Sequence, residues 1–414
     1  MMLRGLSLFA LLCAVALAAA VPVSIPTGFT VVTRSSVWTF SNQSTLTTFE
    51  PQLKLDLPFA ALNQSAVSGA AGGLKVGGFL VISNSTVALG RPKASIHGSP
   101  SFGYDVIHNF GANKYSLVDI FFINNTEQVS AVGLSMGEQR NVTFFHSANA
   151  GKTWSVTDYG PAGLFHSASL AFKYEHGIAV EGGRIFRTLD YGRVWAQTAA
   201  NSTEFFTKAA IHDHHLSVVF GRSPQLALTF MLKSHDSGHH WQAGPALPDF
   251  TPASADVTGF VFLDADTWVL TTSGGEIWRS VNSGEAWNRT FAPLDVNGND
   301  TDNYWNDIAH QSHWGVLMAV GRSTIAVSTD DGLNWTESPV QESVDGFVKV
   351  VPDIARALRP KPHPHKKEDG DAVGVALGLV FGLGGGLLLI GGLVGFYVYR
   401  RYYQPRFSYS TINS

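Results

Sequence analysis

Five octets of one pattern decide the fold of this chain: SANAGKTW at Ser147–Trp154, TLDYGRVW at Thr188–Trp195, SHDSGHHW at Ser234–Trp241, SVNSGEAW at Ser280–Trp287 and STDDGLNW at Ser328–Trp335. Their shared pattern is Ser/Thr-x-Asp/Asn-x-Gly-x-x-Trp. Successive tryptophans are 41, 46, 46 and 48 residues apart. Self-similarity at a fixed period of this size indicates an array of equivalent structural units.

Each octet is interpreted as a tight turn. The Asp or Asn at its third position can accept hydrogen bonds from backbone amides two residues on, and the glycine supplies a positive φ. The tryptophan then packs against the strand before the turn. We therefore predict structural roles for the shared positions and assign no catalytic residue. The structural set is Ser147, Asn149, Gly151, Trp154, Thr188, Asp190, Gly192, Trp195, Ser234, Asp236, Gly238, Trp241, Ser280, Asn282, Gly284, Trp287, Ser328, Asp330, Gly332 and Trp335.

The residues around each octet predict four short strands. In the fourth copy these strands are Val257–Leu263, Thr267–Thr272, Glu276–Ser280 and Trp287–Thr290, separated by turn residues. The second copy repeats this order. Four antiparallel strands in about 46 residues are typical of a propeller blade, so the predicted fold class is an all-β propeller.

The number of blades follows from the spacing. The blade of the first octet begins near Leu117, and residues 25–116 have room for two more blades without a recognisable octet. Two plus five gives seven blades, with six and eight left open because the N-terminal part is poorly periodic. We expect an N-terminal strand to pair with Phe347–Val351, which closes the ring and removes its exposed edges.

Both ends of the chain carry apolar segments that predict a membrane topology. Residues 1–20 read as a secretory signal peptide, and residues 372–399 as one transmembrane helix followed by Arg400 and Arg401. The segments between and after them are a lumenal propeller (21–358), a Pro-rich charged stalk (359–371) and a cytoplasmic tail (400–414). The expected product is a single-pass type I membrane protein of the Golgi and endosomal system or the cell surface.

The lumenal orientation agrees with the glycosylation motifs. Nine Asn-x-Ser/Thr acceptors lie between the two apolar segments: Asn42, Asn63, Asn84, Asn124, Asn141, Asn201, Asn288, Asn299 and Asn334. Asn334 is the least convincing of them because it lies inside a predicted tight turn.

Composition excludes several classes of site and partner. The net charge is -4, without the basic surplus of a nucleic-acid-binding protein. The only cysteine, Cys13, belongs to the signal peptide, so the sequence predicts no disulfide, no thiolate metal site and no cysteine nucleophile. No motif in the sequence predicts a cofactor. Histidines cluster at His212, His214 and His215 and at His235, His239 and His240. Because neither cluster has the spacing of a known zinc site, we interpret both as loop histidines and predict no metal.

The tail and the apolar segment each carry a further motif. Tyr409 and Ile412 fit the Tyr-x-x-hydrophobic pattern that clathrin adaptors read, which would make an adaptor a partner of the tail. Gly374, Gly378, Gly382 and Gly386 recur every fourth residue. Small residues at this spacing allow close helix contact, so a dimer through this helix and a monomeric anchor both stay open.

The five octets resemble the Asp-box, or bacterial neuraminidase, repeat. Its carriers include the six-bladed sialidases, the seven-bladed photosystem assembly factors and the ten-bladed sortilin receptors. The layout of signal peptide, propeller, one span and short tail resembles the sortilin family, although this chain lacks that family's length and its cysteine-rich module. The resemblance implies a sorting receptor whose propeller binds a lumenal protein or glycan ligand.

Two alternatives stay open. A membrane-anchored sialidase would need three arginines around a substrate carboxylate and a tyrosine nucleophile, and the chain offers Arg140, Arg184, Arg222, Arg322 and Tyr304. The Phe-Arg-Ile-Pro segment that usually supplies the first arginine is absent, and Arg184 belongs to ordinary blade sequence. The third reading is a cell-surface adhesion propeller.

Overall fold

The computed structural model describes most of the chain between Phe29 and Pro352. The described segments are residues 29–33, 36–40, 53–56, 69–73, 78–83, 85–93, 101–111, 114–123, 126–163, 168–200, 204–226, 228–252, 255–292, 305–312, 315–322, 324–339 and 347–352. The chain divides into two units, Met1–Leu358 and Arg359–Ser414. All described residues belong to the first unit.

The described residues form seven antiparallel sheets of four strands each, numbered here as blades 1 to 7. Blade 1 consists of β28 (Phe347–Pro352), β1 (Phe29–Thr33), β2 (Ser36–Phe40) and β3 (Leu53–Asp56). Blade 2 consists of β4 (Gly69–Gly73), β5 (Gly78–Ser83), β6 (Thr86–Lys93) and β7 (Ser101–Asn109), and blade 3 of β8 (Tyr115–Phe122), β9 (Val129–Ser135), β10 (Asn141–Ser147) and β11 (Ser155–Pro161). Blade 4 consists of β12 (Ala168–Lys173), β13 (His176–Glu181), β14 (Arg184–Thr188) and β15 (Ala196–Ala200), and blade 5 of β16 (Phe205–Ile211), β17 (Ser217–Ser223), β18 (Leu228–Ser234) and β19 (Gln242–Ala243). Blade 6 consists of β20 (Val257–Phe262), β21 (Trp268–Thr272), β22 (Ile277–Ser280) and β23 (Asn288–Phe291), and blade 7 of β24 (Trp305–Gln311), β25 (Val316–Gly321), β26 (Thr324–Ser328) and β27 (Thr336–Pro339).

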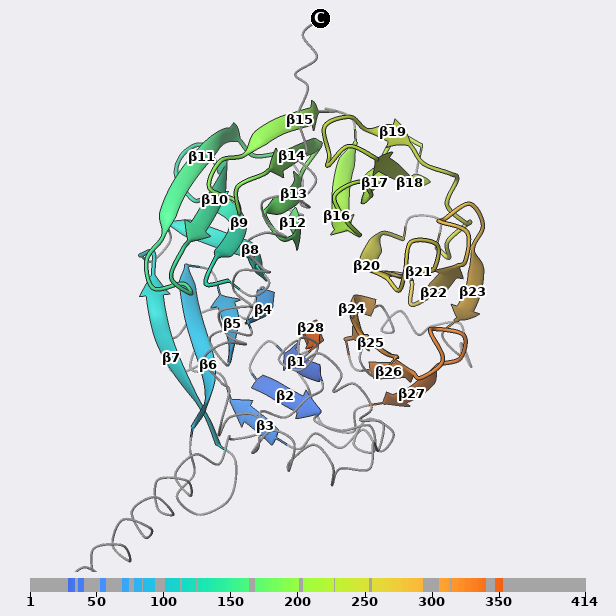
Figure 1. Cartoon of the computed structure of the whole chain (residues 1–414), viewed down its shortest axis with the longest axis horizontal. Coiled ribbons are helices and arrows are strands. Elements are labelled where there is room, and N and C mark those ends of the chain that lie inside the picture. The colour runs from blue at the N-terminus through green and yellow to red at the C-terminus, as the bar shows by residue number, and fades with distance from the viewer. Residues whose placement is uncertain are drawn as a thin grey trace, which may run out of the picture. The chain divides into compact units, whose positions relative to one another are not determined.

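The blades close into a ring. The first strand of each sheet lies innermost, and these strands contact one another in the cyclic order β28, β4, β8, β12, β16, β20 and β24, with β24 returning to β28 (Figure 1). The innermost strand of blade 1 comes from the other end of the propeller sequence: Phe29 pairs with Pro352 and Val32 with Lys349. The predicted all-β fold, its four-stranded blades and the closing strand are confirmed, and the sheets number seven.

The hydrophobic core lies between blades. Each of six buried clusters takes its side chains from two neighbouring blades. Between blades 3 and 4, for example, Phe144 and Val142 pack with Phe172, Phe186 and Trp195. Strands of a blade therefore need apolar residues on both faces, as β25 shows with six buried positions in succession. This arrangement explains why the blades read as continuous apolar runs rather than as alternating strands.

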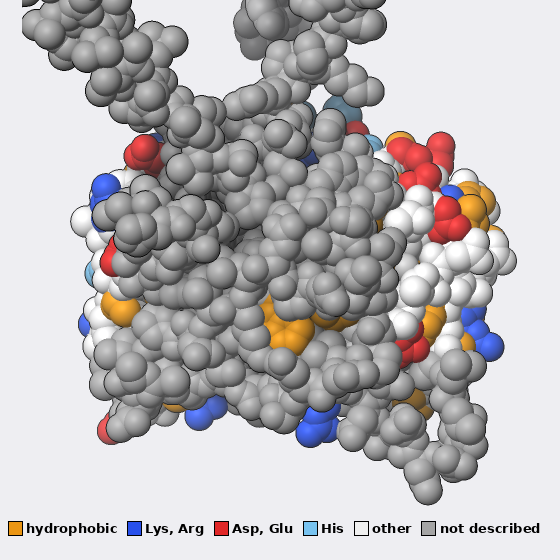
Figure 2. All heavy atoms as spheres, turned by 90° about the horizontal axis from the view of Figure 1, so that it is seen from below, with side chains coloured by type: hydrophobic (Ala, Val, Ile, Leu, Met, Phe, Trp, Pro, Cys, Tyr) orange, Lys and Arg blue, Asp and Glu red, His pale blue; other side chains and the backbone are white. Residues whose placement is uncertain are grey.

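Figure 2 shows acidic and basic residues as separate patches among polar and apolar ones on the side it presents. This pattern agrees with the low charge content of the sequence, 14% Asp, Glu, Lys and Arg.

Several predictions concern residues outside the described part. They are the signal peptide (1–20), the stalk (359–371), the transmembrane helix (372–399), the tail (400–414), and the adaptor motif at Tyr409 and Ile412. Within the described segments, the structure contains no helix with the length and apolar character needed to cross a membrane.

Candidate functional site: the propeller channel

The innermost strands of four blades carry a bulge at the same place. The register with the second strand shifts between Leu117 and Asp119, and likewise in blades 5, 6 and 7, so that one extra residue is inserted. A bulge bends the strand and re-aims the next side chain. The residues that follow the four bulges are Asp119, Lys208, Gly259 and Asp307.

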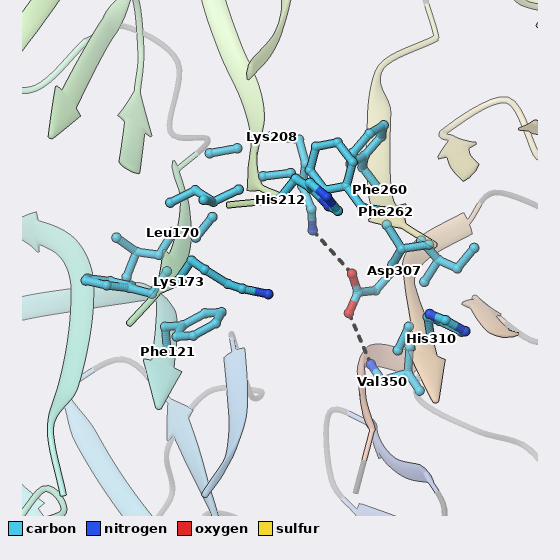
Figure 3. Close-up of a pocket in the computed structure, with 18 of the residues that line it drawn as sticks. Phe121, Leu170, Lys173, Lys208, His212, Phe260, Phe262, Asp307, His310 and Val350 are labelled. Carbon is cyan, nitrogen blue, oxygen red and sulfur yellow. Dashed lines mark hydrogen bonds and ion pairs between the residues drawn. The ribbon is translucent and has the colours of Figure 1, made fainter. Parts of the chain in front are cut away.

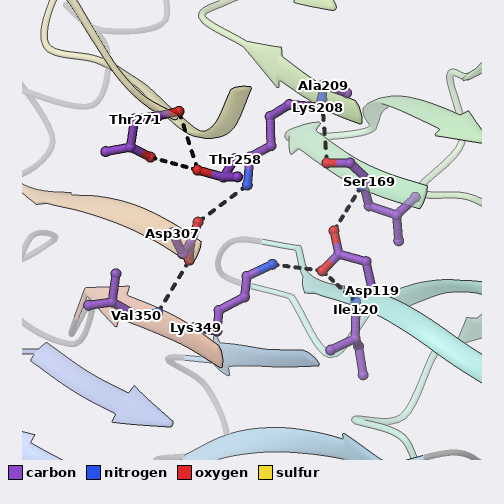
Figure 4. A network of polar contacts seen from close by, with 11 residues as sticks. Asp119, Ile120, Ser169, Lys208, Ala209, Thr258, Thr271, Asp307, Lys349 and Val350 are labelled. Carbon is purple, nitrogen blue, oxygen red and sulfur yellow. Dashed lines mark hydrogen bonds and ion pairs between the residues drawn. The ribbon is translucent and has the colours of Figure 1, made fainter. Parts of the chain in front are cut away.

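A repeated hydrogen bond links these positions from blade to blade. Oδ2 of Asp119 accepts from the amide of Leu170 at 2.9 Å, Oγ of Ser169 accepts from the amide of Ala209 at 3.3 Å, and Oδ2 of Asp307 accepts from the amide of Val350 at 3.2 Å. In each case the acceptor residue occupies this position in its own blade. The donor amide belongs to the residue directly after the corresponding position in the next blade. We call the residues at these equivalent positions the polar layer: Asp119, Ser169, Lys208, Gly259, Asp307 and Lys349. Figure 4 shows all of them except Gly259.

Two ion pairs complete the polar layer, and each skips one blade. Nζ of Lys208 lies 3.2 Å from Oδ1 of Asp307, and Nζ of Lys349 lies 2.7 Å from Oδ1 of Asp119. The skipped position in blade 6 is Gly259, which has no side chain to stand between Lys208 and Asp307. In blade 2 the inner strand β4 reads GAAGG. The blades that the Lys208 and Lys349 side chains pass thus have small residues in their innermost strands: Gly259 in blade 6 and the GAAGG sequence in blade 2.

The carboxylates of the polar layer favour the charged form of Lys349. Burial lowers the pKa of Lys349, but the carboxylates of Asp119 and Asp307 outweigh this effect and place the pKa above its ordinary value. Each carboxylate also accepts at least one backbone N–H bond, which offsets part of the cost of burying its charge. The polar layer thus ties blades 1, 3, 4, 5 and 7 together around the channel.

A pocket of about 500 Å³ lies beside this layer in the channel. It is lined by the innermost strands of blades 3 to 7 and of blade 1, from the polar layer toward their C-terminal ends. Its wall includes Phe121 and Phe262, and its polar groups beyond the polar layer include Lys173, His212 and His310 (Figure 3). The innermost strands end on the same face of the propeller as the octets. In an antiparallel blade the connection from the first to the second strand and that from the third to the fourth strand, which holds the octet, lie at the same end.

Lys173 is the pocket's unneutralised cation. Figure 3 shows its side chain extending into the cavity. Within the described segments its Nζ has no ion-pair partner, unlike Lys208 and Lys349, which are paired at the floor. His212 packs against Phe262, with 5.2 Å between ring centroids. Burial lowers the pKa of His310, partly offset by Asp331, so this imidazole is neutral at pH 7.

The predicted octet residues lie in the turns between third and fourth strands, and none of them lines the pocket. All five turns share the same bonds. Oγ of the first residue donates to the Asp or Asn side chain at 2.7–3.0 Å and accepts from the glycine amide at 2.8–3.1 Å.

The acceptor geometry within the octets differs from the expectation. The Asp or Asn oxygen accepts from the amide four residues on, at 2.9–3.0 Å, instead of two residues on. The fourth and fifth octet residues both have positive φ, for example Ser237 at 59° and Gly238 at 79°. Two left-handed residues in succession curl the chain so that later amides point back at the carboxylate. In the third octet the amide of His240, and after it the His240 side chain, hold the pKa of the Asp236 carboxyl well below its usual range.

The tryptophans also pack differently from the expectation. They insert between blades rather than only against their own strand: Trp195 stacks on Phe144 of blade 3 at 4.5 Å, and Nε1 of Trp241 donates to Oγ1 of Thr198 in blade 4. Nε1 of Trp335 likewise donates to Oγ1 of Thr290 in blade 6. An octet therefore joins its blade to the preceding one.

In three blades, a cationic or imidazole residue directly before the octet makes a second link to the next blade. His146 Nδ1 donates to the carbonyl of Tyr191 at 3.1 Å, Lys233 Nζ to that of Ser283 at 2.7 Å, and Arg279 Nε to that of Asp331 at 2.8 Å. Each acceptor is the fourth residue of the next octet. The equivalent residue of blade 7 is Val327, whose next blade has no octet, and it is buried and apolar.

Three glycosylation acceptors fall on described residues. Asn141 begins β10 and is half-buried, and Asn288 is exposed at the start of β23. Nδ2 of Asn334 donates to Oδ2 of Asp330 at 2.7 Å, so a glycan there would break an octet bond. The other acceptors, Asn42, Asn63, Asn84, Asn124, Asn201 and Asn299, lie outside the described residues.

The sialidase candidates lie away from the pocket. Arg140, Arg184, Arg222 and Arg322 occur at the connection of second to third strand in blades 3, 4, 5 and 7, at the opposite end of the blades from the octets. Buried Glu181 pairs with Arg184 at 2.8 Å, and Asp256 lies 3.8 Å from Arg222. Tyr304 is outside the described residues.

Comparisons with known proteins give similarity in fold alone. No protein-family model matches the chain, and no curated protein matches its sequence. One similar solved structure is YCF48 bound to D1 peptide, at 17% identity and TM-score 0.41 over 57% of this chain and 72% of that chain. Another is YCF48 from Cyanidioschyzon merolae, at 14% identity and TM-score 0.48 over 68% and 88%. A third is the GH74 xyloglucanase from Xanthomonas campestris, at 15% identity and TM-score 0.49 over 66% of this chain and 45% of the enzyme. The propeller assignment rests on the seven closed sheets.

Proposed function

We propose that the propeller is the lumenal ligand-binding part of a receptor-like type I membrane protein, and that its ligand enters the channel pocket. The observation that carries the proposal is the ammonium group of Lys173, which has no ion-pair partner among the described residues and extends into a cavity with aromatic walls. Concave, mostly apolar pockets with a few polar groups are the usual form of ligand sites.

The pocket's chemistry favours a ligand with an anionic group beside an apolar one. A carboxylate would pair with Lys173, while Phe121 and Phe262 offer apolar surface on either side of the cavity. An extended protein segment that carries an acidic side chain next to an aliphatic or aromatic one satisfies both requirements. The paired lysines of the polar layer stay engaged with Asp119 and Asp307 and form the floor.

The membrane part of the proposal rests on the sequence. The apolar segment 372–399 would anchor the propeller, the signal peptide would place it in the lumen, and Tyr409 and Ile412 would direct its traffic through an adaptor. Removal of N-linked glycans from the protein in sealed vesicles, with and without detergent, tests this orientation. Acceptors that are glycosylated and protected inside the vesicle support it, and acceptors that carry no glycan contradict it.

Affinity capture with three forms of the full chain tests the pocket. Wild type, Lys173→Glu and Lys152→Glu would be purified from their own cells, and co-purifying proteins identified by mass spectrometry. Lys152 is a matched control because its exposed side chain lies in an octet outside the pocket. We expect a lumenal partner with wild type and Lys152→Glu and at least a tenfold loss with Lys173→Glu. Equal retention by all three forms would contradict the pocket as the binding site.

The glycosidase alternative lacks support in the described pocket, because none of the four described candidate arginines lines it. Turnover of a fluorogenic sialoside by wild type that persists in Lys173→Glu would favour it nonetheless. An adhesion propeller would instead lose a surface partner when its glycans are removed.

A further inference from the structure

Two neighbouring blades bring three metal-binding side chains together on the octet-bearing face. One ligand atom from each of Glu175, His176 and His214 lies within 4.8 Å of the other two. Glu175 and His176 belong to the hairpin between β12 and β13, and His214 to the loop between β16 and β17. This site is separate from the channel pocket, which none of the three residues lines.

The first hairpin holds its two residues firmly. Lys173 pairs with His176 in register, so Tyr174 and Glu175 form a two-residue turn in which Tyr174 has a φ of 56°. The carbonyl of Glu175 accepts from the amide of Tyr191 at 3.0 Å, which joins the turn to the octet of the same blade. His176 is half-buried, and its Nδ1 is buried without a hydrogen-bond partner in the described structure.

The second loop presents His214 toward the first. Oδ1 of Asp213 accepts from the amides of His215 and Leu216, both at 2.8 Å, and Oγ of Ser237 donates to the carbonyl of His214. The ring of Tyr174 stacks on the imidazole of His214, with 5.7 Å between centroids and 22° between planes. The His214 and His176 rings are 4.5 Å apart, and Nε2 of His176 is 3.6 Å from Oε1 of Glu175.

We propose that Glu175, His176 and His214 bind a divalent transition metal ion of the Zn²⁺ class, shared between blades 4 and 5. Two imidazoles and one carboxylate form a ligand set that Zn²⁺ takes, with the fourth position left to water or to another ligand. Tetrahedral bonds of about 2.1 Å would bring the ligand atoms to about 3.4 Å from one another. Glu175 and His214 are partly or fully exposed, so their side chains can rotate to close this difference.

The other loop histidines do not share this arrangement. His212 packs against Phe262, and His240 is bonded to Asp236 in its own octet. A metal at the proposed site would join two hairpins that the fold already places side by side. It would therefore stabilise the folded protein, by an amount that grows with the logarithm of the metal concentration once that concentration exceeds the dissociation constant.

Isothermal titration of the full chain with Zn²⁺ tests the proposal. We expect one ion per chain for wild type and for the His215→Ala and His239→Ala controls, which change exposed histidines on the same face. His214→Ala should weaken binding at least tenfold, and so should Glu175→Gln. Equal affinity in His214→Ala and wild type, or an equal loss in the two controls, would overturn the site.

A spectroscopic and a thermal measurement check the same variants. Co²⁺ in place of Zn²⁺ should give visible absorption bands with wild type that His214→Ala lacks. Zn²⁺ should raise the unfolding temperature of wild type but not of His214→Ala, while the two proteins unfold at similar temperatures in a chelator. A similar rise in both proteins would contradict the site. If His214→Ala unfolds at a much lower temperature than wild type in chelator, Glu175→Gln, whose side chain has the same size, is compared with wild type instead.

Discussion

The octet turns and the polar layer occupy equivalent places in successive blades, yet they use repetition in opposite ways. The octets repeat one chemistry five times, with local bonds of two to four residues in separation. The polar layer fills its equivalent positions with different residues: Asp, Ser, Lys, Gly, Asp and Lys. Its ion pairs join residues 99 and 230 positions apart. The repeats thus build the blades, whereas the departures from repetition close the channel and shape its floor.

Breaking the polar layer should have the largest effect. Asp307→Ala removes the partner of Lys208 and the acceptor of the Val350 amide together. Removing one partner from a buried ion pair costs about 3–5 kcal/mol, so we expect a loss of about 3 kcal/mol in the free energy of unfolding. Chemical denaturation would measure it.

A double variant sharpens this prediction. Lys208→Met combined with Asp307→Leu removes both charges and should recover part of the stability that Asp307→Ala loses. If the double variant loses as much stability as Lys208→Met and Asp307→Leu lose in sum, the two residues are not a coupled unit.

An octet bond should matter less and should tolerate an amide. Asp330→Ala removes the acceptor of the Asn334 amide and of the Ser328 hydroxyl, for an expected loss of about 1–2 kcal/mol. Asp330→Asn should be within about 0.5 kcal/mol of wild type, because Asn149 and Asn282 make the same bonds in their octets. Comparable losses in both variants, measured by denaturation, would show that the charge rather than the acceptor is required.

The residue before an octet should contribute a smaller amount. Lys233→Met removes the bond to the carbonyl of Ser283 and the contact of Nζ with the Trp268 ring, 5.0 Å from its centroid. We expect a loss of about 1 kcal/mol in thermal or chemical unfolding. Lys152→Met, at an exposed position, should leave the stability unchanged. An equal loss in both variants would show that the bond of Lys233 to the next blade does not stabilise the protein.

Acidification should give the smallest effect. Burial and then Arg193 lower the pKa of His146, which also has a buried Nε2 without a partner. A histidine with a lowered folded-state pKa contributes stability that is complete above its unfolded pKa of about 6.5 and is lost as the pH falls below it. The unfolding temperature should therefore drop from pH 7.2 to 5.5, and drop less in His146→Gln. An identical drop in the variant would show that groups other than His146 cause the pH dependence.

The sequence predicts the repeat well because its chemistry is local. The octets and their spacing predict the strands of blades 4 and 6 to within a few residues, and the closing strand near Phe347 follows from the arithmetic of blade length. The Asp and Asn side chains of the octets accept from amides four residues on, whereas the prediction was two. Two successive positive φ values cause this difference, and they cannot be deduced from an Asx pattern with one glycine.

The pocket and the metal site could not be predicted in the same way. Lys173 resembles any charged residue at the end of a strand until the ring places it in the channel. His176 and His214 come from different blades, so no local spacing joins them. One signal was available for the polar layer: Asp119, Lys208, Asp307 and Lys349 each put a charge directly before an apolar stretch in an innermost strand. Aligning the repeats on that position would have indicated it.

Site-specific cross-linking from the pocket in living cells would show whether the ligand enters the channel beside Lys173. A photoreactive benzophenone amino acid would replace Phe262 on the pocket wall or, as a control, Val194 at an exposed octet position. We expect a covalent adduct with a lumenal protein from position 262 that disappears when Lys173→Glu is added, and no such adduct from position 194. An adduct from position 194 alone, or one from position 262 that persists with Lys173→Glu, would contradict the channel pocket as an anion-binding ligand site.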